Sequence, residues 1–323
     1  MTDATRIQLI APSGWPAGES LARGVERLRQ AGCQVTGEDA ARRRYLRFAG
    51  TDAERAADLN RLADPDQVLP DVVMAVRGGY GVHRILDQLD YAGLRKRLTG
   101  KPFALVGHSD ITALNLALLA KSELITFAGP MLAYDFGGQT TSGFTLDQFW
   151  GTLRSSAHVV RWQGSPLPAQ VNVMGPLWGG NLAVLCSLLG TPYMPDIRRG
   201  VLFIEDVFEP VYRIERLLCQ LKLSGVLDRQ RALVLGDFSG YRADEYDPAY
   251  DMRALVEYVR GITDVPVVTH LPFGHCRNKL TLPVGSRARL RVGADGKAEL
   301  AFAGYPHLQA GAAQGAGIRN VGT

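Results

Sequence analysis

Apolar runs and amphipathic segments alternate along the first half of the chain. Residues 7–11 and 72–76 are short apolar runs of the kind that form buried strands. Apolar residues recur at helical spacing over residues 20–31, and Gly32 follows them as the expected helix C-cap. Thr-Asp-Ala-Glu at residues 51–54 has the pattern of a capping box and predicts a helix through residue 62. This alternation predicts a parallel sheet with helices on both faces.

One strand-to-helix corner in this pattern carries candidate chemistry. The apolar run 102–106 is followed by GHSD at residues 107–110, and Ile111, Leu114 and Leu118 then recur at helical spacing. A serine at such a corner projects its hydroxyl out of the fold, and the next backbone N–H lies at a helix N-terminus. A hydrolase uses this arrangement for a nucleophile and half of an oxyanion hole. Ile111, however, stands where the α/β-hydrolase elbow has glycine, which argues against a general esterase.

The second half of the chain mixes strands and helices less regularly. WGGN at residues 178–181 is expected to open an apolar helix that ends at Gly190. A strand is predicted at residues 201–204 and a helix at residues 211–223. Further strands are expected at residues 232–235, 265–269 and 280–284.

These patterns predict an α/β protein of two domains. We expect a parallel-sheet, flavodoxin-like N-terminal domain over residues 1–155 and a smaller mixed α/β domain over residues 172–305. The weakly patterned segment 156–171 is interpreted as a linker, and residues 306–323, which are rich in glycine and alanine, as a flexible tail. The active site is expected in the cleft between the two domains.

Composition narrows the class of protein. With 323 residues, 46% apolar and 21% charged, the chain has the profile of a globular protein, and its net charge of +4 gives no reason to expect a nucleic-acid partner. Arg42, Arg43 and Arg44 form the only run of three arginines, which we interpret as a solvated face. No apolar stretch approaches about 18 residues and no signal peptide is visible, so we expect a cytoplasmic protein without a membrane segment.

The cysteines predict neither disulfides nor a redox motif. Cys33, Cys186, Cys219 and Cys276 lie far apart in the sequence, and no pair has the C-x-x-C spacing. The first three fall in or beside apolar helical segments. Reduced, buried thiols are therefore expected there.

A serine nucleophile requires a base, and the imidazole in turn requires an acid. Among the six histidines, His270 and His275 stand at strand ends, and His275 is favoured because it follows the loop Pro-Phe-Gly. His108 adjoins Ser109, so its side chain is expected to point away from the serine. Glu205 is the favoured acid because it directly follows the apolar strand 201–204.

Asp206 and Glu209 remain alternatives to Glu205. Both are explained as well or better by capping of the helix that begins near residue 211, where negative charge is favourable. Arg-Gly-Gly-Tyr-Gly at residues 77–81 lacks the glycine order and the lysine of a phosphate loop. It is either a tight turn or a loop whose backbone N–H faces Ser109.

Two other chemistries are rejected. Cys276 adjoins His275, but neighbouring residues in an extended chain point to opposite sides and seldom reach each other. His270 and His275 lack the spacing of a zinc-binding helix and have no third ligand, so no metal is expected. For a substrate carboxylate, Arg77 and Arg277 are the candidate partners near the predicted site loops.

Several short motifs, taken together, resemble one enzyme family. They are Ala11-Pro12-Ser13, Arg77-Gly78-Gly79-Tyr80-Gly81, Gly107-His108-Ser109-Asp110-Ile111-Thr112-Ala113, Gly129-Pro130, Trp178-Gly179-Gly180-Asn181-Leu182, Leu189-Gly190-Thr191-Pro192, Glu205-Asp206, Arg213-Ile214-Glu215-Arg216 and Phe273-Gly274-His275. In this order they resemble the L,D-carboxypeptidases of murein recycling, the muramoyltetrapeptide carboxypeptidase family of serine peptidases. The resemblance extends over residues 7–304.

The resemblance implies a nucleophile at Ser109, an acid at Glu205 and a base at His275. It implies an oxyanion hole made by the backbone N–H groups of Asp110 and Gly79. The family cleaves the bond between the third residue, usually meso-diaminopimelate, and the terminal D-alanine of a cytoplasmic murein tetrapeptide. No metal or other cofactor is implied, and a homodimer is expected.

Two substrate contacts and two alternative functions accompany this interpretation. Arg77 and Tyr80 are the candidate substrate-binding residues on the glycine loop. The first alternative function is a self-immunity peptidase of the same family, which cleaves an aminoacyl-nucleotide antibiotic. The second is a module that binds muropeptides without turnover, against which the intact set of serine, glutamate and histidine argues.

Overall fold

The computed structural model describes residues 4–164, 170–242 and 244–309. The first half of the chain alternates strands and helices, as its sequence pattern predicts. Its regular elements are β1 (Arg6–Ile10), α1 (Gly18–Gln30), β2 (Gln34–Thr36), α2 (Glu38–Arg42), α3 (Asp52–Asn60), β3 (Val72–Ala75), α4 (Tyr91–Leu98), β4 (Ala104–Val106), α5 (Ile111–Ser122), β5 (Thr126–Ala128) and α6 (Gly143–Leu153). Single helical turns are η1 (Arg61–Ala63), η2 (Val82–Arg84), η3 (Leu86–Gln88) and η4 (Leu132–Phe136).

The second half contains longer strands and fewer helices. Its elements are β6 (Ala157–Gln163), β7 (Val171–Asn181), α7 (Leu182–Ser187), β8 (Val201–Val207), α8 (Val211–Leu223), the turn η5 (Leu227–Arg229), β9 (Ala232–Ser239), α9 (Met252–Ile262), β10 (Val267–Val268), β11 (Leu282–Val284), β12 (Arg287–Val292) and β13 (Lys297–Ala303). None of the helices in the described part of the chain has the length and apolar character needed to cross a membrane.

The first sheet has the strand order β11-β5-β4-β3-β1-β2. The pairs among β1 to β5 are parallel, and β11 joins β5 in the antiparallel direction. The order 2-1-3-4-5 of these five strands is that of flavodoxin-like folds, so the predicted class of the N-terminal domain is confirmed. All four residues of β3 are buried, as expected for a strand covered on both faces. In such sheets the carboxyl ends of the strands carry the functional loops.

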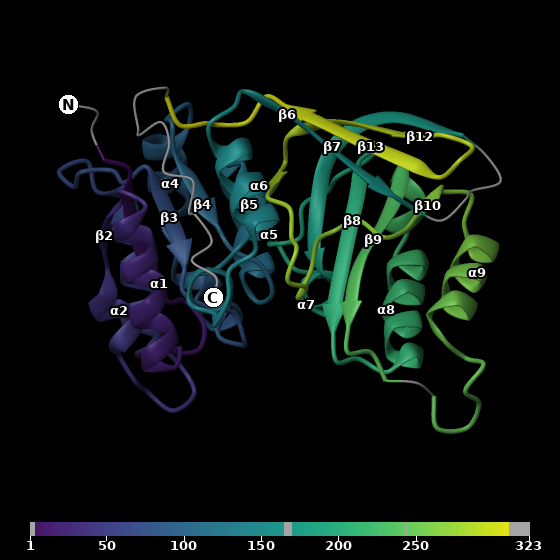
Figure 1. Ribbon diagram of the computed structural model, residues 1–323, viewed down its shortest axis with the longest axis horizontal. Coiled ribbons are helices and arrows are strands. Elements are labelled where there is room, and N and C mark those ends of the chain that lie inside the picture. Colours follow the sequence, from purple (N-terminus) through teal and green to yellow (C-terminus); the bar gives the residue numbers. More distant parts are fainter. Residues whose placement is uncertain (1–3, 165–169, 243, 310–323) are drawn as a thin grey trace, which may run out of the picture.

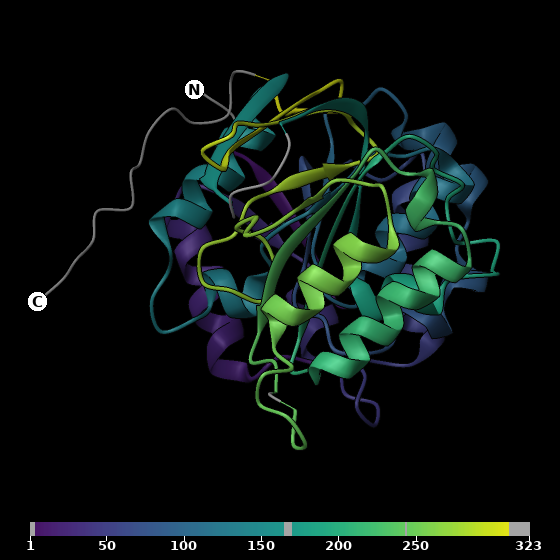
Figure 2. The ribbon, with the colours of Figure 1, turned by 90° about the vertical axis from the view of Figure 1, so that its right-hand side faces the viewer.

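The second sheet is mixed, with the order β10-β9-β8-β7-β12-β13-β6. Its four strands β10, β9, β8 and β7 are parallel, whereas β12, β13 and β6 form antiparallel pairs. Figure 1 shows the two sheets side by side, with α5 and α7 between them. Figure 2 shows α8 and α9 in front of the second sheet, on the side away from the first. The predicted mixed α/β character of this half is confirmed.

Two strands, β6 and β11, pair outside the domains in which the sequence pattern placed them. β6 lies within the segment expected to be a linker, yet it forms the edge of the second sheet beside β13. β11 lies within the range expected for the second domain, yet it pairs with β5 and completes the first sheet. Both pairings are long-range, which is why a local sequence pattern does not reveal them. Because β10 pairs with β9 and β11 pairs with β5, the loop between β10 and β11 connects the second sheet to the first.

Other expectations differ from the structure in detail. A helix is expected from the sequence after the glycine loop of residues 77–81, but the structure has the short turns η2 and η3 there. WGGN forms the end of strand β7, and the helix begins only at Leu182. Of the expected tail, Leu308 is buried and its N–H donates to Leu153 O at 2.7 Å, whereas residues 310–323 lie outside the described residues. The capping box of Thr51 and Glu54 on α3 is confirmed.

Candidate active site

Ser109 lies at the carboxyl end of β4, between that strand and α5. Its backbone φ is +63°, in the left-handed region that non-glycine residues rarely adopt. Helix α5 begins two residues later, at Ile111. Within the described residues, the Ser109 hydroxyl makes no hydrogen bond to the protein, and it lines a cavity of about 550 Å³. The strained corner therefore presents a free hydroxyl to an open space.

The glycine loop after β3 lies directly against this serine. Arg77, Gly78 and Gly79 line the same cavity. A Cβ at Gly78 would lie 2.7 Å from Ser109 Cβ and 2.8 Å from its Oγ, so only glycine allows this approach. In the part of the chain that the structure describes, neither the N–H of Gly79 nor that of Asp110 donates a hydrogen bond to the protein. Two backbone donors beside the serine thus remain unpaired.

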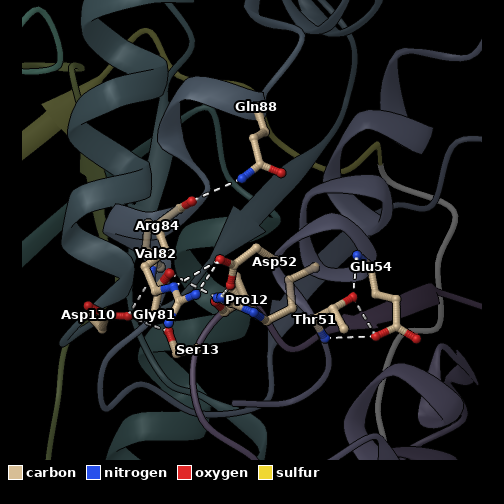
Figure 3. Close-up of polar contacts among 11 residues, drawn as sticks. Pro12, Ser13, Thr51, Asp52, Glu54, Gly81, Val82, Arg84, Gln88 and Asp110 are labelled. Carbon is tan, nitrogen blue, oxygen red and sulfur yellow. Dashed lines mark hydrogen bonds and ion pairs between the residues drawn. The ribbon is translucent and has the colours of Figure 1, made fainter. Parts of the chain in front are cut away.

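Asp110 connects this loop to the serine corner. Its Oδ2 accepts hydrogen bonds from Ser13 Oγ at 2.6 Å and from the Val82 N–H at 3.0 Å. Figure 3 shows this cluster, in which Ser13, Gly81 and Val82 surround the carboxylate of Asp110. Burial raises the pKa of Asp110, while its hydrogen bonds to Ser13 and Val82 oppose the increase. The side chain of Asp110, the residue after Ser109, therefore holds the end of the glycine loop through the Val82 N–H.

Arg55 of α3 also holds the glycine loop, through the carbonyl oxygen of Gly81. Its side chain is fully buried, and its guanidinium donates to the carbonyl oxygens of Pro12 and Gly81 and to Asp52. Asp52 in turn accepts from Arg84 Nε at 2.9 Å, just beyond the loop. Residues 81–84 are therefore held by hydrogen bonds to α3 and to Asp110, the residue after Ser109.

Glu205 contacts His275, which lines the same cavity as Ser109. Glu205 lies in β8, where the register with β9 shifts between Ile204 and Asp206, and such an irregularity re-aims a side chain. Its side chain is fully buried, and its Oε2 lies 2.7 Å from His275 Nδ1. At Gly274 φ is +144°, and a Cβ there would lie 3.1 Å from Glu205 Cβ. Glycine thus lets the histidine loop pass over the glutamate.

The environment of His275 favours its protonated form. Burial lowers the pKa of His275, but the hydrogen bond and the charge of Glu205 together outweigh it and raise the pKa above the ordinary value of 6.5. The positive charge of Lys279 acts in the lowering direction. His275 lines the same cavity as Ser109. An imidazole held by a buried carboxylate is able to accept a proton from a hydroxyl in such a cavity.

His108 is buried beside His275, with ring centroids 5.1 Å apart in an edge-on arrangement. Its Nδ1 lies 2.9 Å from Gly129 O, and its Nε2 lies 3.3 Å from Lys279 Nζ. A carbonyl oxygen only accepts, so Nδ1 carries the proton and Nε2 accepts from the ammonium. Burial, and then the charges of Lys279 and His275, hold the pKa of His108 well below its ordinary value. His108 is therefore a neutral neighbour of the serine corner.

The alternatives to Glu205 and His275 lie in other settings. Asp206 accepts from the Ala183 N–H at 3.0 Å, so it caps α7 rather than the expected α8, and burial raises its pKa to about 6. Glu209 forms an ion pair with Arg213 on α8 at 2.9 Å, as expected for a charge at that helix start. His270 has a φ of +63° and lines a different cavity, together with residues of β9 and α9.

The remaining candidates are distributed around the cavity. Arg277 and Arg77 both line the cavity. Tyr80 does not line it, and its ring packs against that of Phe48 with 6.0 Å between the ring centroids. Burial raises the pKa of the Cys276 thiol to about 11, so this residue is not a thiolate nucleophile at neutral pH. Among the residues that the structure describes, no three histidine, cysteine, aspartate or glutamate side chains are grouped to hold a metal ion.

Sequence reasoning missed Lys279 and Asp135. Both line the cavity, and their side chains form a buried ion pair with Lys279 Nζ 2.8 Å from Asp135 Oδ1. The available signal was a single lysine that directly precedes the apolar run 280–284. A charge beside such a run is either exposed or held by a partner.

The fold and this cavity define a two-domain α/β protein with a polar site between its sheets. Residues 7–129 match the family model of the LD-carboxypeptidase N-terminal domain, and residues 174–290 match that of the LD-carboxypeptidase C-terminal domain. The chain therefore belongs to the LD-carboxypeptidase family, and the predicted resemblance is confirmed.

Known relatives agree with this assignment. The chain is 31% identical to a murein tetrapeptide carboxypeptidase of Pseudomonas aeruginosa, over 88% of this chain and 92% of the relative. It is similar to the crystal structure of muramoyltetrapeptide carboxypeptidase from Oxalobacter formigenes, with 43% identity and a TM-score of 0.86 over 94% of this chain and all of that one. It is also 30% identical to the microcin C7 self-immunity protein MccF of Escherichia coli, over 89% of each chain. These relatives support a carboxypeptidase function at the level of the family.

Proposed function

We propose that the chain is a serine-type L,D-carboxypeptidase that releases the terminal D-alanine of murein tetrapeptides. The observation that carries the proposal is the 2.7 Å contact between Glu205 and His275, because His275 lines the same cavity as Ser109 with its unpaired hydroxyl. Membership of the LD-carboxypeptidase family and the murein tetrapeptide carboxypeptidase of Pseudomonas aeruginosa support the choice of substrate.

In the proposed mechanism Ser109 attacks the carbonyl carbon of the third residue. His275 takes the hydroxyl proton and later gives it to the leaving amine of D-alanine, while Glu205 orients the imidazole and stabilises its charged form. The N–H groups of Asp110 and Gly79 hold the oxyanion. Removal of one such donor typically costs about 2.7–4 kcal/mol of barrier. Water then cleaves the acyl-enzyme, with His275 acting as the base again.

The test is release of D-alanine from a purified murein tetrapeptide, with chelator present. The wild-type protein is expected to release one D-alanine per tetrapeptide and none from the tripeptide. Ser109→Ala is expected to lower the rate by roughly 10⁶, because the residues of such a site act as a unit. Full activity of Ser109→Ala would overturn the proposal. A pentapeptide in the same assay measures whether a second D-residue beyond the bond is accepted.

The second candidate is a self-immunity peptidase, which the likeness to MccF favours. One structure of MccF, described as a complex with aspartyl sulfamoyl adenosine, has a TM-score of 0.80 and 26% identity over 95% of this chain and 98% of that chain. The same preparation is therefore assayed with aspartyl sulfamoyl adenosine beside the tetrapeptide. A kcat/KM that favours the nucleotide compound would assign the second function instead.

The proposed setting is the cytoplasm, and the proposed assembly is a homodimer. The four cysteines are free thiols, which is in keeping with a reducing compartment.

A further inference from the structure

Lys279 is a buried residue that lines the same cavity as Ser109 and His275. Its side chain is 3% exposed, and Nζ donates to Asp135 Oδ1 at 2.8 Å and to His108 Nε2 at 3.3 Å. An ammonium group carries three N–H donors. Within residues 4–164, 170–242 and 244–309 these two atoms are its only acceptors, which leaves one N–H of the ammonium group without a protein acceptor.

The position of this lysine is held by α6. Thr145 Oγ1 accepts from the Lys279 N–H at 3.0 Å and donates to Arg277 O at 2.9 Å. Ser142, the N-cap residue of α6, donates its hydroxyl to Asn278 Oδ1 at 2.7 Å. Ser142 and Thr145 both line the cavity, so the N-terminus of this helix adds favourable potential for an anion there.

Stability alone does not explain the pair. Removing two charges from water costs several kcal/mol per ion in general, and well-packed apolar replacements are often as stable or more so. Asp135 is satisfied without a ligand, because its Oδ2 accepts from the Met131 N–H at 2.7 Å. A buried lysine with a spare donor in a cavity wall is therefore better explained by recognition than by folding.

We propose that Lys279 is the specificity-determining residue that binds the terminal carboxylate of the substrate peptide, an inference that rests on the proposed function. The carboxylate of the released residue lies one residue beyond the bond that Ser109 attacks. His108, which precedes Ser109, is also the neighbour of Lys279, so the ammonium lies near the nucleophile. A carboxypeptidase has to distinguish a free carboxylate from a continuing peptide, and a buried cation makes that distinction strongest.

The rival cations are less suited to this role. Arg77 already donates from Nη1 to Trp15 O at 3.1 Å. Arg277 is exposed, so water screens its charge. Lys279 is the buried cation among these three lining residues.

The experiment compares the tetrapeptide with the same peptide carrying a C-terminal primary amide. The enzymes are the wild type, Lys279→Met, and the matched variants Arg77→Met and Arg277→Met. The wild type is expected to prefer the free acid by roughly 10- to 100-fold in kcat/KM, the range of one hydrogen bond to a charged group. Lys279→Met is expected to lose this preference by slowing on the acid while its rate on the amide stays nearly unchanged. Both arginine variants are expected to keep the preference.

Three outcomes would overturn the proposal. The first is an equal loss on acid and amide in Lys279→Met, which indicates a purely structural role. The second is a preference that disappears in Arg77→Met or Arg277→Met instead. The third is an effect of Lys279→Met that depends on the side-chain carboxylate of the third residue, so that it disappears when the peptide has lysine in place of diaminopimelate. A wild type that releases neither D-alanine nor its amide would instead refute the proposed function.

A second variant guards against misfolding. Lys279→Met alone leaves the carboxylate of Asp135 buried without its partner, so the double variant Lys279→Met/Asp135→Asn is made as well. It removes both charges and keeps an acceptor for the Met131 N–H. The same collapse of the acid preference is expected in this folded variant, and a retained preference would overturn the proposal. All rates are taken on the plateau of the pH profile, because the charge of Lys279 lowers the pKa of His275.

Discussion

The carboxylate of Asp110 accepts the N–H of Val82 at 3.0 Å, so the residue after the candidate nucleophile holds the end of the glycine loop. Removal of this acceptor in Asp110→Ala is expected to let Gly79 drift from the serine. We predict a fall in kcat of up to about 100-fold, the lower end of the loss of one oxyanion donor, with KM nearly unchanged. Steady-state kinetics on the tetrapeptide measure both constants.

Asp58→Ala is the matched control for that variant. Asp58 is also buried and pairs with Arg43, away from the cavity. It is expected to lower stability without changing kcat, whereas Asp110→Asn, which keeps an acceptor for Val82, is expected to retain most of the activity. If kcat fell equally in Asp58→Ala and Asp110→Ala, the loss would reflect general destabilisation rather than positioning of the loop.

The pH dependence of activity is expected to follow His275. Its pKa is raised because the hydrogen bond and charge of Glu205 outweigh burial, and only the neutral imidazole is a base. In the wild type, kcat/KM is therefore expected to fall as the pH decreases through a value above 6.5, the ordinary pKa of histidine. In Glu205→Gln the charge is gone and burial remains, so the acidic limb is expected to move to lower pH.

The plateau of Glu205→Gln is expected to drop by up to about 10⁴, as for the amide variant of a Ser-His-Asp site. The charges of Asp206 and Lys279 also act on the pKa of His275, and burial raises the pKa of Asp206 itself to about 6. Asp206→Asn is therefore the control, and a smaller shift in the same direction is expected. An acidic limb that stays in place in Glu205→Gln would contradict the assignment of Glu205 as the partner of His275.

The parts of the fold and of the site that could be predicted from the sequence are those that depend on residues close together in the chain. Ser109, Glu205 and His275 each stand beside a strand or in a loop at its end, so a local pattern of apolar residues followed by a polar one identifies them. Which carboxylate meets which histidine depends on the irregular register of β8 and β9 and on the close approach of Gly274 to Glu205, neither of which a local pattern shows. The local pattern alone therefore left several candidates, and the resemblance to the family selected Glu205 and His275, which are in contact in the structure.

Long-range pairings account for most of the remaining differences. The pairing of β11 with β5 joins residues more than a hundred positions apart, and the contact of Lys279 with Asp135 depends on it. No property of residues 280–284 alone indicates that they complete the first sheet. By contrast, β12 was missed although its buried and exposed residues alternate, which is the pattern of a half-covered strand.

The left-handed backbone at Ser109 predicts that glycine is more stabilising than alanine at this position, the reverse of their order in a helix. At a φ of +63°, glycine avoids a penalty of roughly 1–2 kcal/mol that alanine carries. Ser109→Gly is therefore expected to be about 1 kcal/mol more stable than Ser109→Ala in urea unfolding. At Ser20 in helix α1 the order is expected to reverse, because alanine is the better helix former. If alanine were the more stable residue at both positions, the strain at Ser109 would be refuted.

The contact between Gly78 and Ser109 predicts that one methyl group disables the site. In Gly78→Ala the new Cβ would lie 2.7 Å from Ser109 Cβ, closer than side-chain atoms approach, so the loop or the serine has to move. Activity on the tetrapeptide is expected to fall by about 100-fold or more, since one oxyanion donor then leaves its place. Gly261→Ala in helix α9 is the matched control, because its Cβ meets nothing within 4 Å. That variant is expected to keep full activity and to gain up to about 1 kcal/mol of stability. Full activity of Gly78→Ala would show that the loop does not need its place against Ser109.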